Sequence, residues 1–404
     1  MDHNSLQQPE KSPVQAATGR SSRQFFIDNL RTGLIILVVM HHVAMVYGAS
    51  APFYYFEPPF TDPLAFLVLL VFALVNQAWF MGAFFLLAGY FTPGSYDRKG
   101  LGSFLKDRLV RLGVALILFI FVLSPISWIG LYQMPASLTG ITTPLTWQAY
   151  PKVIGLGPLW FVAMLLIFSF GYAAWRILTR NRASSSMNSS SPPSYLRIGI
   201  FILALALVSY LVRIVVPLGE SVNLFVDFLS FPTLAYLPQY LSFYVLGTVA
   251  SRRDWFRTLP SSMGAVGFVA AVVAGVFLFP LAFSSHWFSL ELTEALGTAF
   301  GNGQWQSAVY ALWDSIFAVG MCLSLIILFR RFFNGHGRFG RFLAQQSYAV
   351  YVLHIPIIVF LALALRGIDL GPLPKFGLVA VIVVPTCFIV AYIVRKIPLA
   401  SRIL

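Results

Sequence analysis

Ten apolar runs, each long enough to cross a lipid bilayer as a helix, constrain the fold of this chain more than any other feature. A helix needs about 20 apolar residues to span a hydrocarbon core of about 30 Å. Hydrophobic residues form 58% of the 404 residues and charged residues only 10%, which is more apolar surface than one water-soluble core can bury. The sequence therefore predicts an all-α, polytopic integral membrane protein with about ten transmembrane helices. The expected spans are 28–48, 64–91, 109–132, 158–178, 197–216, 234–250, 261–283, 306–330, 343–366 and 375–395.

The charges between these runs predict the orientation. Of the 27 Lys and Arg residues, 23 fall in connections on one side of the predicted membrane. Because cytoplasmic connections are rich in Lys and Arg, we expect that side, with both termini, to be cytoplasmic. The net charge of +13 is therefore explained by basic residues that mark the cytoplasmic side. The expected partner is the lipid bilayer, and no nucleic acid partner is expected.

Polar segments divide the chain into two tails and one membrane domain. Residues 1–23 have several prolines and glycines but no apolar core, so we expect a disordered cytoplasmic tail and no signal peptide. Residues 24–396 form the membrane domain, in which a Ser-rich, flexible cytoplasmic linker at 180–196 separates two groups of five helices. Residues 397–404 form a short cytoplasmic tail. Both cysteines lie inside apolar runs, so neither a disulfide nor a metal site is expected.

The second apolar run is too long for one upright helix. Its 28 residues would extend about 42 Å as a helix, so the helix must tilt strongly or break. Asn76, Gln77 and Gly82 mark the expected break. Two neighbouring side-chain amides at membrane depth need partners or water, so we expect Asn76 and Gln77 to face a cavity and to be candidate substrate contacts.

The first apolar run carries an arginine and two histidines. Arg31 and His42 are eleven residues apart, which separates them by about 16 Å along a helix and returns to nearly the same face. His41 lies on another face, about 100° away. Ionisable groups inside a membrane are costly and often functional, so His42 is the candidate catalytic residue, although a packing histidine is the alternative.

Two other ionisable residues are expected at a similar depth. Asp314 lies about eight residues from the outer end of its run and His42 about six, so the carboxylate could orient the imidazole as in a His–Asp dyad. The alternative is that Asp314 only binds a backbone or Trp donor. His354 is followed by Pro356, which interrupts helical hydrogen bonding, and packing is its expected role, with a substrate contact as the alternative.

Basic residues at the cytoplasmic start of the third run are candidates for binding phosphate. Arg108 and Arg111 are three residues apart on one helix face, with Lys106 nearby. Such a pair can hold a phosphate with bidentate geometry, although basic residues that only mark the cytoplasmic end of a membrane helix would look similar.

Trp160 and Trp313 are expected to pack in the core or to lie at the membrane interface, and stacking on sugar rings is the alternative. The sequence contains no Walker loop, dinucleotide fingerprint or Gly-x-Ser-x-Gly element.

Taken in order, these motifs resemble the acyltransferase-3 family of integral membrane acyltransferases, and within it the glucan biosynthesis protein C branch. The resemblance depends on the Arg, ten residues, His spacing of Arg31 and His42 and on the Arg-x-x-Arg of Arg108 and Arg111. The matching segments are 28–31, 81–91, 104–111, 157–161, 244–247 and 347–354.

The resemblance implies transfer of an acyl group from cytoplasmic acyl-CoA, either succinyl-CoA or acetyl-CoA, to a hydroxyl of a periplasmic or extracellular glucan or polysaccharide. It also implies a multi-pass protein of the cell inner membrane, with His42 as the catalytic histidine and Arg31, Arg108 and Arg111 at the donor end. On this hypothesis His42 is the general base and Asp314 orients it, while an acyl-histidine intermediate is an open alternative.

Two other classes of function remain as alternatives. A proton-coupled transporter of small solutes would use His42 and Asp314 as a proton relay. That reading requires the two groups of five helices to be a repeat, yet the last five runs contain no second Arg-to-His stripe. A structural or polymer-export subunit would have no chemistry of its own and would tolerate loss of His42.

Overall fold

The computed structural model describes residues 24–48, 53–57, 62–179, 191–223, 230–231, 234–284, 292–335 and 337–404. The predicted tail at 1–23 and the first part of the predicted linker, 180–190, lie outside these ranges. Within them the fold is helical, apart from one short antiparallel pair of strands, β1 (Val222–Asn223) and β2 (Ser230–Phe231). The prediction of an all-α protein is confirmed.

Eight helical segments in the described part of the chain are long and apolar enough to cross a membrane. Fewer spans appear than the ten predicted, because 64–91 and 109–132 lie in one helical run and 234–250 forms a helix of only 16 residues, α10 (Leu237–Arg252). The segments are Phe25–Tyr47 (α1), Pro63–Tyr132, Trp147–Leu178, Tyr195–Val215 (α9), Ser261–Ala282 (α12), Trp305–Phe332 (α14), Arg338–Ala364 (α15) and Pro372–Val394 (α16).

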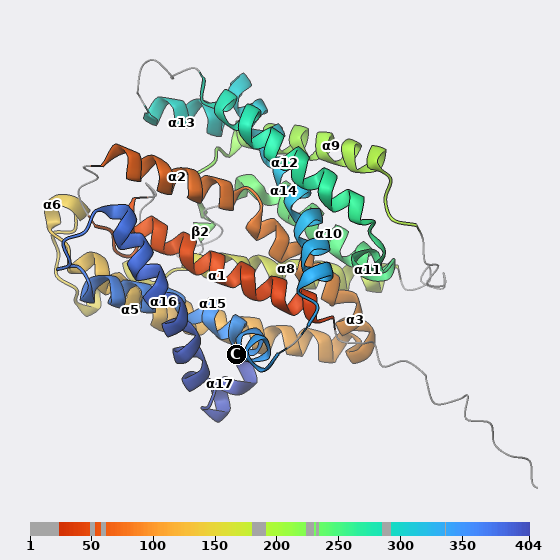
Figure 1. The fold of residues 1–404 in the computed structure, drawn as a ribbon. Coiled ribbons are helices and arrows are strands. Elements are labelled where there is room, and N and C mark those ends of the chain that lie inside the picture. The colour runs from red at the N-terminus through yellow and green to blue at the C-terminus, as the bar shows by residue number, and fades with distance from the viewer. Residues whose placement is uncertain are drawn as a thin grey trace, which may run out of the picture.

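The first helix lies in the middle of the bundle (Figure 1). It packs against α15 and α16 on one side and against α14 and the helices of the second run on the other. Shorter elements complete the chain: α6 (Ala136–Thr139), η3 (Trp147–Ala149), α7 (Tyr150–Val153), η4 (Gly157–Leu159), α8 (Trp160–Leu178), η6 (Leu234–Tyr236), α11 (Trp255–Thr258), α13 (Leu292–Phe300) and α17 (Pro398–Ile403).

The predicted break in the second run is confirmed. Helix α2 (Pro63–Gln77) ends after the two amide residues and α3 (Phe80–Arg108) begins three residues later. The break leaves backbone groups without helical partners, and Gln239 of α10 donates to the carbonyl oxygen of Ala78 at 2.7 Å. Gln77 donates to the hydroxyl of Tyr240 at 3.1 Å. The break is therefore stabilised by side chains of α10.

A second interruption turns the chain inside α3. Gly100 has φ +70° and ψ 170°, a left-handed conformation that glycine adopts without strain. The connection between the predicted spans 64–91 and 109–132 is therefore helical on both sides of this residue. The second arm runs on to Tyr132 through two π-helical turns: η1 (Leu109–Gly113), α4 (Val114–Leu118), η2 (Phe119–Leu123) and α5 (Ser124–Tyr132).

Two glycines allow α3 and α10 to approach with their backbones in contact. A Cβ atom added at Gly89 would collide with the carbonyl oxygen of Tyr244, and one added at Gly247 would collide with the carbonyl oxygen of Leu86. Small residues at such crossings are typical of membrane helices, where association depends on close packing. The crossing fixes α10 beside the segment that contains the helix break.

We expect Gly89→Leu to lower the free energy of unfolding by about 3 kcal/mol, because the backbones must separate to admit the side chain. The measurement is thermal unfolding of the protein in detergent, followed by size-exclusion chromatography. Gly171→Leu on α8 is the matched control, since an added Cβ there meets no atom within 4 Å. Equal stability of the two variants would contradict this view of the crossing.

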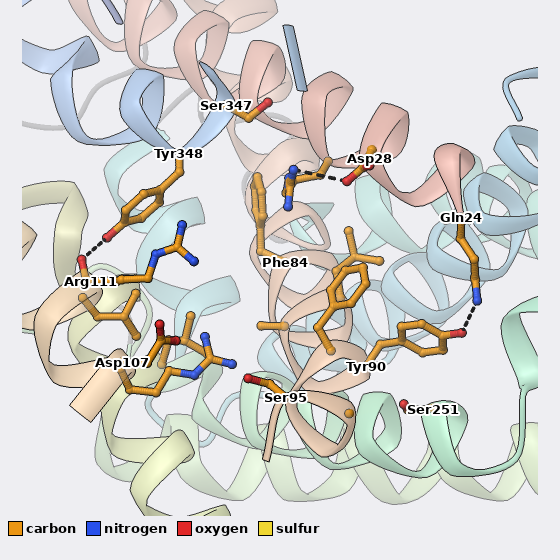
Figure 2. Close-up of a pocket in the computed structure, with 18 of the residues that line it drawn as sticks. Gln24, Asp28, Phe84, Tyr90, Ser95, Asp107, Arg111, Ser251, Ser347 and Tyr348 are labelled. Carbon is orange, nitrogen blue, oxygen red and sulfur yellow. Dashed lines mark hydrogen bonds and ion pairs between the residues drawn. The ribbon is translucent and has the colours of Figure 1, made fainter. Parts of the chain in front are cut away.

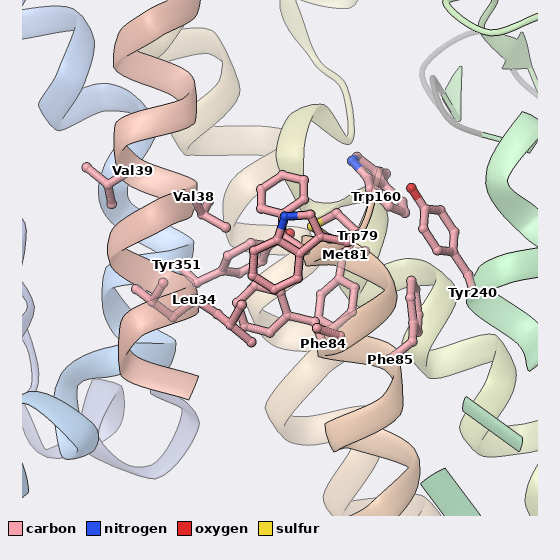
Figure 3. Close-up of a cluster of buried hydrophobic side chains, with 14 of the residues drawn as sticks. Leu34, Val38, Val39, Trp79, Met81, Phe84, Phe85, Trp160, Tyr240 and Tyr351 are labelled. Atoms are coloured by element: carbon pink, nitrogen blue, oxygen red, sulfur yellow. The ribbon is translucent and has the colours of Figure 1, made fainter. Parts of the chain in front are cut away.

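A buried aromatic cluster joins five helices at the centre of the bundle. Figure 3 shows Leu34 and Val38 of α1, Phe84 and Phe85 of α3 and Tyr351 of α15 meeting in this cluster. On its far side the ring of Trp160 stacks on that of Tyr240, with centroids 5.3 Å apart. These side chains form a packed apolar layer through the middle of the structure.

Candidate functional site

A cavity of about 890 Å³ lies between α1, α3, α8, α10 and α15 at the end of the bundle where α1 begins. Its volume is within the range of small-molecule and cofactor sites. Seven basic side chains and three acidic ones line it, so its walls carry an excess of positive charge. The basic residues are Arg31, Arg98, Lys99, Arg108, Arg111, Arg252 and Arg257, and the acidic residues are Asp28, Asp107 and Asp254.

Several of these cations already have a carboxylate partner. Arg31 contacts Asp28 at 3.3 Å, and Lys99 contacts Asp107 at 2.8 Å. Arg252 and Arg257 are also paired with aspartates. Within the described ranges, no carboxylate lies within 4.0 Å of the three remaining arginines, which are Arg98, Arg108 and Arg111. These three have charge available for an anionic ligand.

Arg108 and Arg111 both line the cavity, which is where the predicted phosphate site requires them. Figure 2 shows Arg111 and Asp107 on one wall and Asp28 and Gln24 on the opposite wall. Arg111 lies in η1, and such π-helical turns often occur at functional sites. The prediction for Lys106 is wrong. It is exposed and outside the cavity lining, since two residues turn a helix by about 200°.

The inner end of the cavity is apolar and reaches the aromatic cluster. Ile35, Phe84, Phe161 and Tyr351 line it there. The ring of Tyr351 lies 5.8 Å from the ring of His354, between centroids. The basic cavity therefore leads, through one aromatic side chain, to a pair of histidines.

His42 lies against a second histidine. Its Nδ1 atom is 3.2 Å from Nε2 of His354 and 2.9 Å from the carbonyl oxygen of Val38. The His42 ring also stacks on Phe53, with centroids 5.5 Å apart and planes 28° apart. His354 is fully buried, and its own Nδ1 is 2.7 Å from the carbonyl oxygen of Tyr351.

Sequence reasoning missed this contact because it assigned His354 to packing. The depth argument applied to Asp314 could have found it, since His354 also lies near the middle of its apolar run. His41, one residue from His42, packs on Phe80 of α3 at 5.1 Å between ring centroids and meets the His42 ring edge-on at 5.4 Å. The prediction that His41 lies on a different face is confirmed.

The predicted His42–Asp314 dyad is wrong. Asp314 is buried and accepts a hydrogen bond from Arg213 of α9 at 2.5 Å, while the described ranges show no contact between Asp314 and His42. The Arg213 guanidinium also lies over the rings of Tyr236 and Tyr310, at 4.9 and 5.7 Å. A carboxylate in an apolar interior needs a cation as its partner, and for Asp314 that cation is Arg213 of α9.

The predicted substrate contacts Trp160, Trp313, Asn76 and Gln77 also lie outside the cavity lining. Trp313 is fully buried against Phe279, with ring centroids 4.5 Å apart, and Trp160 stacks in the central cluster. Asn76 and Gln77 are part of the helix break described above, and neither lines this cavity. These side chains stabilise the fold around the site.

A short segment, 53–57, lies against the C-terminal part of α1. Its backbone is tied to α1 by the Glu57 N–H, which donates to the carbonyl oxygen of Val46 at 2.9 Å. Lys375 of α16, itself buried, holds the Glu57 carboxylate at 2.6 Å. Burial raises the pKa of Tyr54 to about 12, and burial with the neighbouring Glu57 raises that of Tyr55 to about 12, so both phenols are neutral at pH 7.

We expect Lys375→Met to lower the free energy of unfolding by about 3 kcal/mol, because it leaves the Glu57 carboxylate partly buried without its countercharge. Thermal unfolding in detergent provides the measurement. The charge-exchanged double variant Glu57→Lys with Lys375→Glu should recover at least half of the loss. If the double variant is less stable than the single one, the ion pair is not what holds the segment.

Residues 24–392 match the acyltransferase domain that defines the acyltransferase-3 family. The matched range includes the whole cavity and both His42 and His354. The chain belongs to the acyltransferase-3 family. It is therefore a multi-pass membrane acyltransferase, and the motifs that suggested this family by resemblance led to the correct assignment.

Curated relatives of this acyltransferase-3 protein are bacterial. It is 22% identical over 351 residues to the glucans biosynthesis protein C of Salmonella paratyphi B, which covers 84% of this chain and 83% of that protein. It is 23% identical over 349 residues to the protein of that name from Salmonella heidelberg, with the same shares of each chain covered. No solved structure matches the chain.

Proposed function

We propose that this membrane acyltransferase transfers a succinyl or acetyl group from coenzyme A on the cytoplasmic side to a hydroxyl of a periplasmic or extracellular glucan or polysaccharide. It would act in the cell inner membrane. The observation that carries the proposal is a basic cavity whose apolar end stops at Tyr351, beside the His42–His354 pair. The glucan acceptor is inferred from the names of the relatives.

The donor end of the proposal depends on the three arginines without carboxylate partners. Arg98, Arg108 and Arg111 can bind the phosphate groups of an acyl-CoA, because a guanidinium matches phosphate with two parallel hydrogen bonds. The pantetheine arm carries no charge and suits the apolar inner wall at Phe84 and Phe161. A donor held in this way has its thioester at the deep end of the cavity.

The chemical step needs a base at the deep end. His42 would take the proton of the acceptor hydroxyl while that oxygen attacks the thioester carbonyl. The carbon–sulfur bond then breaks, and the coenzyme A thiolate leaves and takes the proton from the imidazolium. The products are an acyl ester of the glycan and free coenzyme A, and no metal takes part in this scheme. Among the described residues, no three His, Cys, Asp or Glu side chains gather as metal ligands would.

The transporter alternative loses its supporting argument. It needed His42 and Asp314 to pass a proton between them, but Asp314 is paired with Arg213 and His42 contacts His354. The described residues thus show no direct contact between the two groups that the relay would need.

The test is mass spectrometry of periplasmic and surface glycans from strains with and without the gene. The proposal predicts that one glycan loses a mass increment of a succinyl or acetyl ester when the gene is removed and regains it on complementation. Identical ester content of all glycans in the two strains would contradict the proposed function.

A further inference from the structure

The hydrogen-bond partners of the two histidines fix where their protons lie. A carbonyl oxygen only accepts hydrogen bonds, so a ring nitrogen beside one must carry a proton. Nδ1 of His354 faces the carbonyl oxygen of Tyr351 at 2.7 Å, and Nδ1 of His42 faces that of Val38 at 2.9 Å. Both imidazoles are therefore protonated at Nδ1.

The contact between the rings then has a direction. With its proton on Nδ1, neutral His354 presents a lone pair at Nε2, which lies 3.2 Å from Nδ1 of His42. The His42 N–H is thus shared between two acceptors, the Val38 oxygen and the His354 nitrogen. Nε2 of His42 keeps its lone pair, and within the described ranges it makes no hydrogen bond.

We propose that His354 is a positioning residue that holds His42 in the tautomer whose Nε2 atom removes the acceptor proton. When Nε2 takes that proton, Nδ1 keeps its own, and the His354 lone pair stabilises the imidazolium until the thiolate takes a proton back. The inference rests on the proposed function, in which His42 is the general base. In this proposal His354 has the role that the buried aspartate has in a Ser-His-Asp triad, which is to orient the catalytic histidine and to stabilise its protonated form.

The packing around His354 supports this positioning role. The side chain is fully buried in α15, a helix that packs along α1, so its ring orientation is fixed from both helices. Phe53 stacks on the other side of the His42 ring and limits its rotation. Together these contacts leave His42 one orientation, in which Nε2 is the only ring nitrogen that can react.

The direct test is the tautomer of His42 in the full-length protein reconstituted in lipid bilayers. Labelling with ¹⁵N-histidine, and assigning the His42 signals by their loss in His42→Gln, should give a protonated Nδ1 and an unprotonated Nε2 at neutral pH. A protonated Nε2 on His42 would overturn the inference, whatever the activity of the protein.

The second test separates positioning from packing with two variants of nearly equal size. His354→Gln keeps an acceptor near the position of Nε2, whereas His354→Leu keeps volume but removes the acceptor. We expect the leucine variant to lose about 10- to 100-fold in kcat, because the His42 N–H then has only the Val38 oxygen as an acceptor and the imidazolium loses the His354 lone pair. KM for the acyl-CoA should be unchanged, because the arginines of the cavity are untouched. The glutamine variant should recover most of the rate. His41→Gln is the matched control and should leave kcat within about 2-fold of the original protein.

Failure of this inference is distinguishable from failure of the proposed function. Full activity of His354→Leu, or equal loss in the glutamine and leucine variants, would overturn the positioning role and leave His42 as the base. Unchanged glycan acylation in a strain without the gene would overturn the proposed function, whereas the tautomer measurement would stand by itself.

Discussion

Replacing His42 with alanine is expected to lower the rate of acyl transfer by about 10²- to 10⁴-fold, the usual contribution of a general base. The reason is that Nε2 of His42 is the base at the deep end of the cavity in the proposed mechanism. The measurement is the initial rate of transfer from labelled succinyl-CoA or acetyl-CoA to a glucan acceptor by the protein reconstituted in vesicles.

The neighbouring histidine provides a matched control. His41→Ala removes the same side chain one residue away, where it packs on Phe80 and, within the described ranges, makes no hydrogen bond to His354. It should keep a rate within a few-fold of the original, even though loss of a buried side chain lowers stability. A His42→Ala protein that folds, inserts and transfers at the original rate would contradict the assignment of the base.

Replacing both Arg108 and Arg111 with glutamine is expected to raise KM for the acyl-CoA donor by at least about 100-fold. A hydrogen bond to a charged group contributes about 1.5–3 kcal/mol to binding. Each of the two substitutions removes one guanidinium that would bind a phosphate group of the donor. The rate at saturating donor should change little, because the histidine pair is untouched. Steady-state kinetics over a range of donor concentrations provide the measurement.

Lys106→Gln is the control for this pair of arginines. It removes one positive charge from the same segment of chain, but its side chain is exposed and outside the cavity. Its KM should match the original at physiological salt, where exposed charges are largely screened. If Lys106→Gln raises KM as much as the arginine variants, the net charge of this end of the protein matters and the cavity does not.

Much of the fold could be predicted from hydropathy because apolar runs in a membrane protein must be helical. The helix break at the two amides was also predictable, since the second run exceeds the bilayer thickness. Local patterns indicated the basic cavity through Arg108 and Arg111, because spacing of three on a helix fixes a common face. Each of these predictions depends on residues close together in the sequence.

The errors concern partners that are far apart in the sequence. Asp314 was matched to His42 by depth, but depth alone does not say which helices are neighbours, and Arg213 lies nearer. His354 was assigned to packing for the same reason, although it contacts His42 across the interface of α1 and α15. The helix on both sides of Gly100 was not predicted, because the segment between the two apolar runs is polar.

Transfer across vesicles of one orientation tests the central claim most directly. Labelled succinyl-CoA or acetyl-CoA is added on the face that carries Arg108 and Arg111, with glucan enclosed on the other face. The account predicts that label enters the glucan only when the donor is on the Arg108 face, and that His42→Gln vesicles leave it unlabelled. Labelling with the donor on the opposite face, or by His42→Gln vesicles, would contradict it.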